Sequence, residues 1–495
     1  MATAVVLAAL TGGLLVPTVA GSAFAATGDR ASVSGRYGDF NGDGHVDLAA
    51  SAPDATVDGV TGAGAVTIAY GSADGAGATQ AERLTISQSS KGVGGQAEAG
   101  DHFGFSVAIA DFNNDGFADL ATGTPGEDVG DDQDAGIVQI LWGSPTGLSS
   151  SARLADPTSS DQHAHGRTLA AGDFNGDGKD DLAAGNTSAQ AWLYAGGITK
   201  EGADSGTYPL GNLNAWGGEV VALTAGDVTG DGADDLLFNH GELYQSGGDA
   251  STLGLQPPVT VGGGRDSYSS VFGDINNDGY GDIVVGRAGD HGGQITYLPG
   301  RPVSQTDPSW TVDWDRRFTL DQGAFDTPGD NDPYDRYGAG LAAGDINGDG
   351  YDDLAVGDPN EDTDTDTVAD AGHVTVLYGG SIGLTTTNRQ VFDQGTEGVP
   401  GENEAGDGFG SRLLLSDLNG DGRKDLTVAA LGEDDGSGAL TTTLLGSDIT
   451  ITITVTGARS LTPTSYLLST DGQPHLGSSL QGHPPITPRP LPEAG

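Results

Sequence analysis

Short apolar runs recur along the whole chain, and most of them end at glycine or proline. Typical examples are residues 65–70 (AVTIAY), 137–142 (IVQILW) and 373–378 (HVTVLY), in which apolar positions alternate with smaller or polar ones. Period-two alternation that is rich in β-branched and aromatic residues predicts β-strands, because successive side chains of a strand point to opposite faces. We find no convincing helix pattern, so the chain is predicted to be all-β.

A ten-residue motif lies between pairs of these runs and occurs seven times. Its first copy, residues 39–48 (DFNGDGHVDL), has Asp at positions 1, 5 and 9, Asn at position 3 and Gly at position 6. The other copies begin at Asp111, Asp173, Asp227, Asp274, Asp345 and Asp417. Successive copies start 72, 62, 54, 47, 71 and 72 residues apart, so each unit has room for several short strands.

These units have the size and number of propeller blades. A blade is a sheet of four strands, and about four to eight blades close into a ring. A linear β-solenoid is the alternative, but its rungs would be shorter and more uniform than these intervals. The spacing therefore favours a seven-bladed β-propeller.

The repeated motif also has the chemistry of a cation-binding loop. Calcium takes about six to eight oxygen ligands, and a glycine at loop position 6 permits the sharp turn around the ion. The ligands would be side-chain oxygens at positions 1, 3, 5 and 9 and the backbone carbonyl at position 7. A simple turn between strands would also use Asp, Asn and Gly, but it does not require Asp at position 9 in every copy.

We therefore predict an all-β, seven-bladed β-propeller with a calcium-binding hairpin loop in each blade, and up to seven bound Ca²⁺ ions. The predicted metal ligands are Asp39, Asn41, Asp43, His45, Asp47, Asp111, Asn113, Asp115, Phe117, Asp119, Asp173, Asn175, Asp177, Lys179, Asp181, Asp227, Thr229, Asp231, Ala233, Asp235, Asp274, Asn276, Asp278, Tyr280, Asp282, Asp345, Asn347, Asp349, Tyr351, Asp353, Asp417, Asn419, Asp421, Arg423 and Asp425.

The composition agrees with a calcium-binding extracellular protein. The formal charge is −50, from 70 acidic and 20 basic residues, and 21 of the acids are the Asp residues of the seven motifs. Seven divalent cations would bring that charge from −50 to −36. The remaining acidity repels polyanions, so nucleic acid and anionic membrane surfaces are not expected as partners. The chain has no cysteine, which excludes disulfides and thiolate metal sites.

The two ends of the chain differ from the repeats. Residues 4–16 are apolar or small and residues 23–25 (AFA) fit the small-x-small cleavage rule, so residues 1–25 are predicted to be an export signal. A basic segment is missing before the apolar run, and a buried N-terminal helix or strand is the alternative. Residues 26–482 are predicted to form the propeller, and the proline-rich residues 483–495 a disordered tail. Residues 475–480 (HLGSSL) echo the strand before each motif and are predicted to close the ring.

The pattern resembles the FG-GAP repeat, the blade unit of the integrin α-subunit propeller and of many secreted bacterial proteins. Phe103-Gly104, Tyr337-Gly338 and Phe409-Gly410 match the first half of the repeat, and residues 50–53, 123–126 and 357–360 match the second half loosely. The resemblance covers about residues 31–482 and is weaker in units three to five, where His165-Gly166 replaces Phe-Gly and an outer strand is expected to be missing. It implies that the aromatic and glycine residues pack blade against blade, and it adds cell adhesion as a functional class.

Blade topology sorts the loops onto two faces. In an antiparallel sheet of four strands, the first and third connections lie at one end and the second at the other. All seven Asp motifs should therefore share one face. The acidic segments 126–135 and 358–371 and the blade connections 89–101, 321–335 and 393–407 should lie on the opposite face.

The sequence has no recognisable catalytic motif, so no catalytic or cofactor residue is predicted. His163 and His165 could form a transition-metal site, but His165 occupies the aromatic position of the repeat and is expected to be structural. The acid pairs Glu127 with Asp128 and Glu361 with Asp362 could act in glycoside cleavage, although solvated charge is the simpler interpretation. Five tryptophans could stack on sugars or fill the core, namely Trp142, Trp192, Trp216, Trp310 and Trp314.

Two classes of function remain. The first is a secreted, calcium-binding adhesion or ligand-binding module, expected to be monomeric, with no membrane span and with an unknown surface protein or polysaccharide as its partner. The alternative is an extracellular hydrolase or lyase that acts on polysaccharide or lipid at the mouth of the propeller channel. A purely structural role in the cell envelope is a third option. A histidine with acidic partners at the channel mouth would favour the enzyme.

Overall fold

The computed structural model describes residues 38–157, 163–187, 190–210, 220, 222–247, 254–255, 258–261, 269–287, 289, 292–301, 312–324, 334–363, 367–446 and 454–480. The predicted export signal and the proline-rich tail lie outside these residues, as do Trp216 and Trp310.

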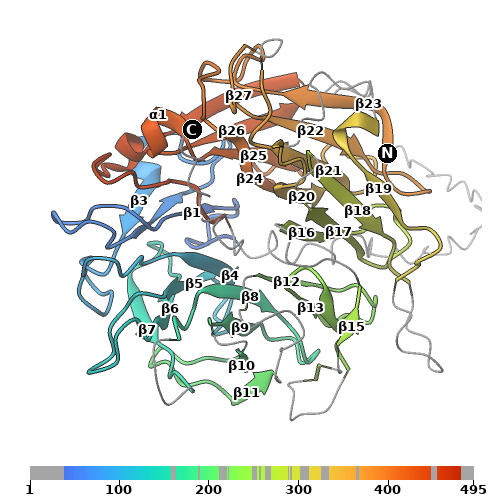
Figure 1. The fold of residues 1–495 in the computed structure, drawn as a ribbon. Coiled ribbons are helices and arrows are strands. Elements are labelled where there is room, and N and C mark those ends of the chain that lie inside the picture. Colours follow the sequence, from blue (N-terminus) through green and yellow to red (C-terminus); the bar gives the residue numbers. More distant parts are fainter. Residues whose placement is uncertain are drawn as a thin grey trace, which may run out of the picture.

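Seven antiparallel sheets lie around a common centre (Figure 1). Within every sheet the strands are neighbours in sequence order. The first sheet contains β1 (Leu48–Ala52), β2 (Ala65–Ala69) and β3 (Arg83–Ile86). The second sheet contains β4 (Ser106–Ala110), β5 (Asp119–Thr124), β6 (Ile137–Trp142) and β7 (Ser150–Arg153). The third sheet contains β8 (Thr168–Gly172), β9 (Asp181–Gly185), β10 (Ala191–Tyr194) and β11 (Thr207–Leu210).

The remaining sheets each have four strands. The fourth contains β12 (Leu223–Gly226), β13 (Asp235–Phe238), β14 (Glu242–Tyr244) and β15 (Val259–Thr260), and the fifth β16 (Ser269–Gly273), β17 (Asp282–Arg287), β18 (Gln294–Leu298) and β19 (Phe318–Leu320). The sixth contains β20 (Gly340–Gly344), β21 (Asp353–Asp358), β22 (His373–Tyr378) and β23 (Thr385–Phe392), and the seventh β24 (Phe409–Ser416), β25 (Asp425–Ala430), β26 (Ala439–Gly446) and β27 (Thr454–Leu461).

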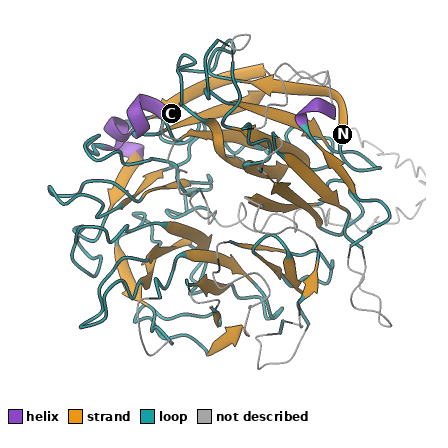
Figure 2. Cartoon of the chain, viewed as in Figure 1, coloured by secondary structure: helices purple, strands orange, loops and turns teal. Residues whose placement is uncertain are grey.

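Helix is scarce in the part of the chain that the structure describes. It consists of the single turn α1 (Glu433–Gly436) and the 3₁₀ turns η3 (Gln80–Glu82), η6 (Gln322–Ala324) and η7 (Pro463–Tyr466). Strands and loops make up nearly everything else (Figure 2). The prediction of an all-β protein is therefore confirmed. No described helix is both long enough and apolar enough to cross a bilayer.

The sheets are the blades of a propeller. The first strands of consecutive blades touch one another in the order β4, β8, β12, β16, β20, β24, and they surround the centre of the ring (Figure 1). The prediction of seven blades is confirmed. The expectation that units three to five lack an outer strand is wrong, because β11, β15 and β19 are present. Those outer strands are short: β15 has two residues.

Neighbouring blades dock through the residues that define the repeat. Phe103 is fully buried and packs with β-branched residues of β2 and with Val107. A Cβ atom added to Gly123 would lie 1.8 Å from the carbonyl oxygen of Gly166, which belongs to the next blade. The Oγ of Ser106 donates a hydrogen bond to that same carbonyl at 2.7 Å. Glycine is therefore required at position 123, because the two backbones are too close for any side chain.

The ring is closed by the end of the chain. Leu480 pairs with Ala50 of β1 in an antiparallel bridge, and the Ser51 N–H donates to the Ser479 carbonyl at 3.0 Å. Leu476 and Leu480 are fully buried in one apolar cluster with residues of the first and seventh blades. Residues 476–480 thus occupy the innermost place of the first blade, as predicted.

Candidate functional site

The Asp motifs form tight loops that lead into the second strand of each blade. Six of them follow the first strand of their own blade, whereas the first motif leads into β1 and the innermost place of that blade is taken by residues 476–480. In the first loop, Asp39 Oδ1 accepts the N–H of Gly42 at 2.6 Å and Asp39 Oδ2 accepts the N–H of Gly44 at 2.8 Å. Asn41 Oδ1 accepts the Asp43 N–H at 2.8 Å. The side chains at positions 1 and 3 therefore organise the backbone of the loop, and the glycines supply its left-handed conformations.

The Asp at position 9 ties each loop to its blade. Asp47 is fully buried, its Oδ2 accepts the Phe40 N–H and its Oδ1 accepts the Gly71 N–H, both at 2.8 Å. Burial, together with the nearby carboxylates of Asp39 and Asp43, raises the pKa of Asp47 to about 7, against the opposing effect of its hydrogen bonds from the backbone. The pKa of Asp119 is raised to about 8 by burial and by the two Asp residues of its own loop.

The same arrangement recurs around the ring. Burial is the main cause of a raised pKa at position 9 in four further loops, at Asp181, Asp235, Asp282 and Asp353. Each loop thus concentrates three carboxylates, one of them buried, and a cation would relieve the repulsion among them. All the donor atoms are oxygens, which suits a hard cation such as Ca²⁺.

The loops are not arranged as closed metal cages. Among the described residues, no three His, Cys, Asp or Glu side chains converge in a way that would hold a metal ion. Most oxygens of the first loop instead accept backbone N–H groups. The residue types fit calcium, and the predicted set of ligands stays a prediction.

Adjacent loops are linked to one another around one face. The N–H at position 8 of a loop donates to the position-1 carbonyl of the preceding loop, for example from Ala118 to Asp39 at 2.9 Å and from Asp234 to Asp173 at 2.8 Å. The Asp234 Oδ2 also accepts the Asp173 N–H at 2.9 Å. At the seam, a Cβ on Gly420 of the last loop would lie 3.1 Å from His45 Nδ1 of the first. These contacts confirm that the motifs share one face.

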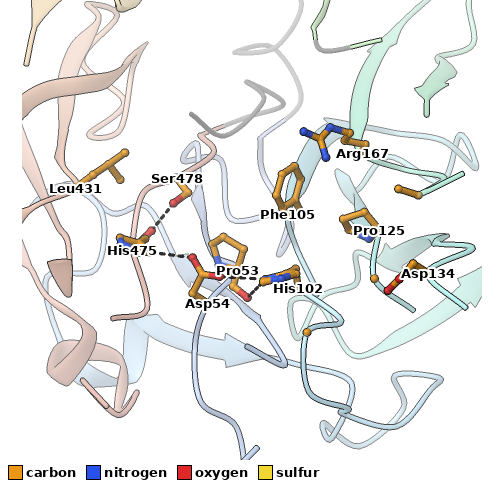
Figure 3. Close-up of a pocket in the computed structure, with 13 residues that line it drawn as sticks. Pro53, Asp54, His102, Phe105, Pro125, Asp134, Arg167, Leu431, His475 and Ser478 are labelled. Carbon is orange, nitrogen blue, oxygen red and sulfur yellow. Dashed lines mark hydrogen bonds and ion pairs between the residues drawn. The ribbon is translucent and has the colours of Figure 1, made fainter. Parts of the chain in front are cut away.

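The opposite ends of the strands surround a pocket of about 400 Å³ (Figure 3). Its lining comes from the ends of β1, β5 and β25, the segments before β4 and β8, and the closing segment 475–480. The lining residues are Pro53, Asp54, Gly100, His102, Phe105, Pro125, Gly126, Asp134, Ala164, Arg167, Leu431, His475 and Ser478. The pocket therefore lies where the first three blades meet the closing seam.

A carboxylate bridges two histidines in this pocket (Figure 3). Asp54 Oδ1 lies 3.0 Å from His102 Nδ1, and Asp54 Oδ2 lies 2.7 Å from His475 Nδ1. His102 Nδ1 is also 3.2 Å from the Pro53 carbonyl oxygen, which can only accept a hydrogen bond. His102 therefore carries a proton on Nδ1, and its Nε2 is the atom that can change protonation.

The contacts in this pocket shift the pKa of Asp54 and the pKa of His102. Burial acts to raise the pKa of Asp54, but hydrogen bonds from His102 and His475 outweigh it and hold that pKa below its ordinary value. The hydrogen bond to Asp54 raises the pKa of His102 against the opposing effect of burial. A histidine that is hydrogen-bonded to a carboxylate is one of the arrangements that can act as a general acid or base.

Arg167 lines the same pocket. Its guanidinium carbon lies 5.6 Å from the centre of the Phe105 ring, which is cation–π distance. With the part of the chain that the structure describes, Arg167 makes no ion pair, so its N–H groups face no carboxylate there.

The other candidates from the sequence lie elsewhere. His165 is buried, and its Nε2 is 2.8 Å from the Tyr194 hydroxyl, which supports the structural interpretation over a metal site. Trp142 is a core residue. Glu127 and Glu361 each pair at 2.6 Å with the side-chain amide of a glutamine 39 residues earlier. The structure therefore does not bring these candidates together as one catalytic site.

Sequence reasoning missed Asp54, His102 and His475. His475 is 421 residues from Asp54, and no local motif connects them. A signal was nevertheless present, because His102 and His475 both stand one residue before the hydrophobic–glycine pair of the repeat, Phe103-Gly104 and Leu476-Gly477. Aligning the closing segment with the other repeats would have placed both histidines at the same end of adjoining blades.

Comparison with known proteins identifies the repeat. Residues 37–68, 103–141, 165–203 and 337–377 match the FG-GAP repeat. Together with the seven-bladed ring, these matches show that the chain belongs to the FG-GAP repeat family of β-propellers.

Part of the chain is also similar to curated proteins. Phosphatidylinositol-glycan-specific phospholipase D of Mus musculus is 34% identical over 145 residues, which is 29% of this chain and 17% of that protein. The proteins of the same name from Bos taurus and Homo sapiens are 34% identical over 154 residues, 30% of this chain and 18% of each relative. The chain therefore spans less than a fifth of the length of these relatives.

Proposed function

We propose that this FG-GAP propeller is a secreted, calcium-binding module for adhesion or ligand binding. The observation that carries the proposal is the Asp motif, which occurs seven times and has three carboxylates in each loop. The carboxylate at position 9 is buried, and its pKa is raised to about 7 or 8 in six of the loops. Without a cation, this arrangement costs free energy at neutral pH. With Ca²⁺ bound, the same carboxylates become ligands, and binding would stabilise the folded ring.

The ligand would bind on the face opposite the calcium loops. The long blade connections and the pocket beside Asp54 lie on that face, and loops on a rigid scaffold are the usual place for recognition. An unknown surface protein or polysaccharide is the proposed partner, and the chain is proposed to act as a monomer outside the cell.

Thermal unfolding in calcium and in chelator tests the proposal. We expect Tm to be substantially higher in CaCl₂ at about 2 mM than in EGTA, because a concentration in this range fills even weak extracellular calcium sites. Magnesium at the same concentration should raise Tm less, because Mg²⁺ demands stricter octahedral geometry. Equal melting curves in calcium and in EGTA would refute the calcium proposal.

A second candidate function rests on the Asp54 triad. Histidine with an acidic partner is a feature expected of a hydrolase or lyase, and His102 and His475 each have Asp54 as that partner. The partial relatives are named as phospholipases, but this chain covers only 17–18% of them, so their activity is not carried over. Turnover of a polysaccharide or phospholipid panel that disappears in Asp54→Asn but persists in Asp134→Asn would support this candidate.

A further inference from the structure

We propose that the fourth Asp motif, residues 227–235, is held in its folded shape by the hydroxyl of Ser246 in place of a cation. The loop would then stay ordered when calcium is withdrawn, and it would fasten the loops on either side of it. The inference deepens the proposed function, on which it rests, because it names one loop of the ring that does not depend on calcium.

Ser246 stands where other blades have glycine. In five other blades a glycine just after the third strand donates its N–H to the position-9 carboxylate of the loop, and these glycines are Gly71, Gly143, Gly196, Gly300 and Gly379. In the fourth blade the donor is the N–H of Ser246, which lies 2.7 Å from Asp235 Oδ1. The fourth blade therefore brings a side chain to a place where these five blades have none.

The five glycines lie very close to their loops. A Cβ atom built on Gly143 would lie 2.1 Å from the carbonyl oxygen of Ala118, and one on Gly379 would lie 2.2 Å from that of Asp352. Both carbonyls belong to position 8 of the loop, and in the other three blades the Cβ would be 2.3–2.7 Å from the position-8 carbonyl. No side chain fits at such distances. Ser246 therefore requires the fourth loop to lie farther from its third strand than these loops do.

The Ser246 hydroxyl uses this space to reach the carboxylate at position 5. Its Oγ lies 3.1 Å from both Oδ1 and Oδ2 of Asp231 and donates a hydrogen bond to that carboxylate. The serine is buried, with 6% of its surface exposed, so its position is fixed by packing. A hydrogen bond to an ionised carboxylate is stronger than one between neutral groups. The serine thus supplies a donor to a carboxylate that the calcium prediction assigns to the ion.

With this bond, both oxygens of every carboxylate in the fourth loop accept a hydrogen bond. Asp227 accepts two glycine N–H groups at 2.6 and 2.9 Å. Asp231 accepts the N–H of position 7 at 3.0 Å in addition to the hydroxyl, and Asp235 accepts the N–H groups of position 2 and of Ser246. In the sixth loop, Asp349 at position 5 accepts only the N–H of position 7 from the described residues. The fourth loop is therefore the more completely bonded of the two.

Position 3 of the fourth loop also differs from the others. In four loops an asparagine Oδ1 at this position accepts the position-5 N–H at 2.8 Å, and these residues are Asn41, Asn175, Asn347 and Asn419. Thr229 has no amide oxygen to offer. Calcium binds six to eight oxygens, so the loss of this oxygen weakens the site. The loss of an acceptor and the gain of a hydroxyl donor both favour hydrogen bonds over a bound ion.

The fourth loop is bonded to the loops on both sides. The Asp234 N–H donates to the Asp173 carbonyl of the third loop at 2.8 Å, and Asp234 Oδ2 accepts the Asp173 N–H at 2.9 Å. The Gly281 N–H of the fifth loop donates to the Asp227 carbonyl at 3.1 Å. A loop that holds its shape without a cation would therefore keep parts of both neighbours in place when calcium is low.

Hydrogen exchange of the whole chain, in CaCl₂ at about 2 mM and in EGTA, tests the proposal. The amides of residues 345–353 should exchange at least about tenfold faster in EGTA, because that loop loses its cation. The amides of residues 227–235 should exchange at the same rate in both solutions. Ser246→Ala should speed exchange of residues 227–235 about tenfold in both solutions, which is the effect of losing one hydrogen bond to a charged group.

Ser144→Ala is the matched control. Ser144 directly follows Gly143, and its Oγ donates to the Gly147 carbonyl at 2.6 Å. None of its recorded hydrogen bonds involves a carboxylate of an Asp motif. This variant also loses a serine hydroxyl beside a loop, but it should leave the exchange of residues 227–235 unchanged.

Counting bound calcium by equilibrium dialysis against about 2 mM CaCl₂ gives a second test. Asp349→Asn should lower the number of ions per chain by one, whereas Asp231→Asn should leave it unchanged. The double variant with Thr229→Asn and Ser246→Gly gives the fourth loop the residues that other loops have, and it should raise the number by one.

Two results would show that the fourth loop binds a cation and would overturn the proposal. They are slower exchange of residues 227–235 in calcium than in EGTA, and the loss of one ion in Asp231→Asn. Unchanged exchange in Ser246→Ala would overturn the role of the hydroxyl. If no ion binds and calcium alters no peptide, the calcium-binding proposal fails by itself, and Ser246→Ala in EGTA still decides whether the hydroxyl holds the loop.

Discussion

Removing the Leu476 side chain should weaken the closure of the ring. Leu476 is fully buried in an apolar cluster that also contains Leu48, Ala50 and Leu440, and it lies in the segment that pairs with β1. Replacing a buried leucine by alanine costs about 2–5 kcal/mol, depending on how far the cavity can collapse. We expect Leu476→Ala to fall in the upper half of this range, because its neighbours belong to two different blades.

The loss is large compared with the stability of a folded domain, which is about 5–15 kcal/mol. Urea unfolding in saturating calcium measures it, with the midpoint and the slope fitted separately. Leu467→Ala is the matched control, since Leu467 is 83% exposed and its truncation should change stability by no more than about 0.5 kcal/mol. Equal midpoints for Leu476→Ala and Leu467→Ala would show that the seam contributes nothing and that this account of ring closure is wrong.

Three further predictions follow from other parts of the ring. Gly123→Ala should cost at least about 1–3 kcal/mol, because its Cβ would lie 1.8 Å from a carbonyl oxygen, while Gly380→Ala, with no atom closer than 3.8 Å, should be mild in the same urea assay. Asp54→Asn should destabilise the protein most at about pH 5–6. Because the pKa of His102 is raised, its contribution to stability is lost as the pH rises through that pKa. Because the pKa of Asp54 is lowered, its contribution is lost as the pH falls through that pKa. Unfolding curves from pH 3 to pH 9 that show a constant difference would contradict this assignment. Asp227→Asn should reduce the calcium-dependent rise in Tm less than Asp345→Asn does, because a threonine hydroxyl replaces the amide oxygen at position 3 of the Asp227 loop; the reverse order would count against this ranking.

Much of the architecture could be predicted from the sequence because its determinants are local and repeated. The loop that begins at Asp39 is organised by hydrogen bonds that span two to seven residues, so a single copy contains nearly all the information that the loop needs. Seven copies at blade-like spacing then predict the number of blades. The outer strands of units three to five were missed because short strands such as β15 leave almost no alternation to detect.

The pocket could not be predicted in the same way. Its central contact joins Asp54 to a histidine 421 residues away, and only the closing of the ring brings the two together. A histidine in this part of the repeat can also be purely structural, as the buried His165 at the aromatic position shows. The geometry of the seam was therefore needed to separate His102 and His475 from His165.

The main-chain links between consecutive loops have a consequence for how the rim would fill with cations. The backbone N–H of Asp234, in the next loop, donates a hydrogen bond to the carbonyl of Asp173. The side chain of Asp234 in turn accepts a hydrogen bond from the backbone N–H of Asp173. An ion captured in one hairpin would therefore stiffen the entry point of its neighbour, and the entropy of ordering the second hairpin would be partly spent already. Cation binding to neighbouring loops would then be cooperative, and the binding equilibria would not be independent of one another.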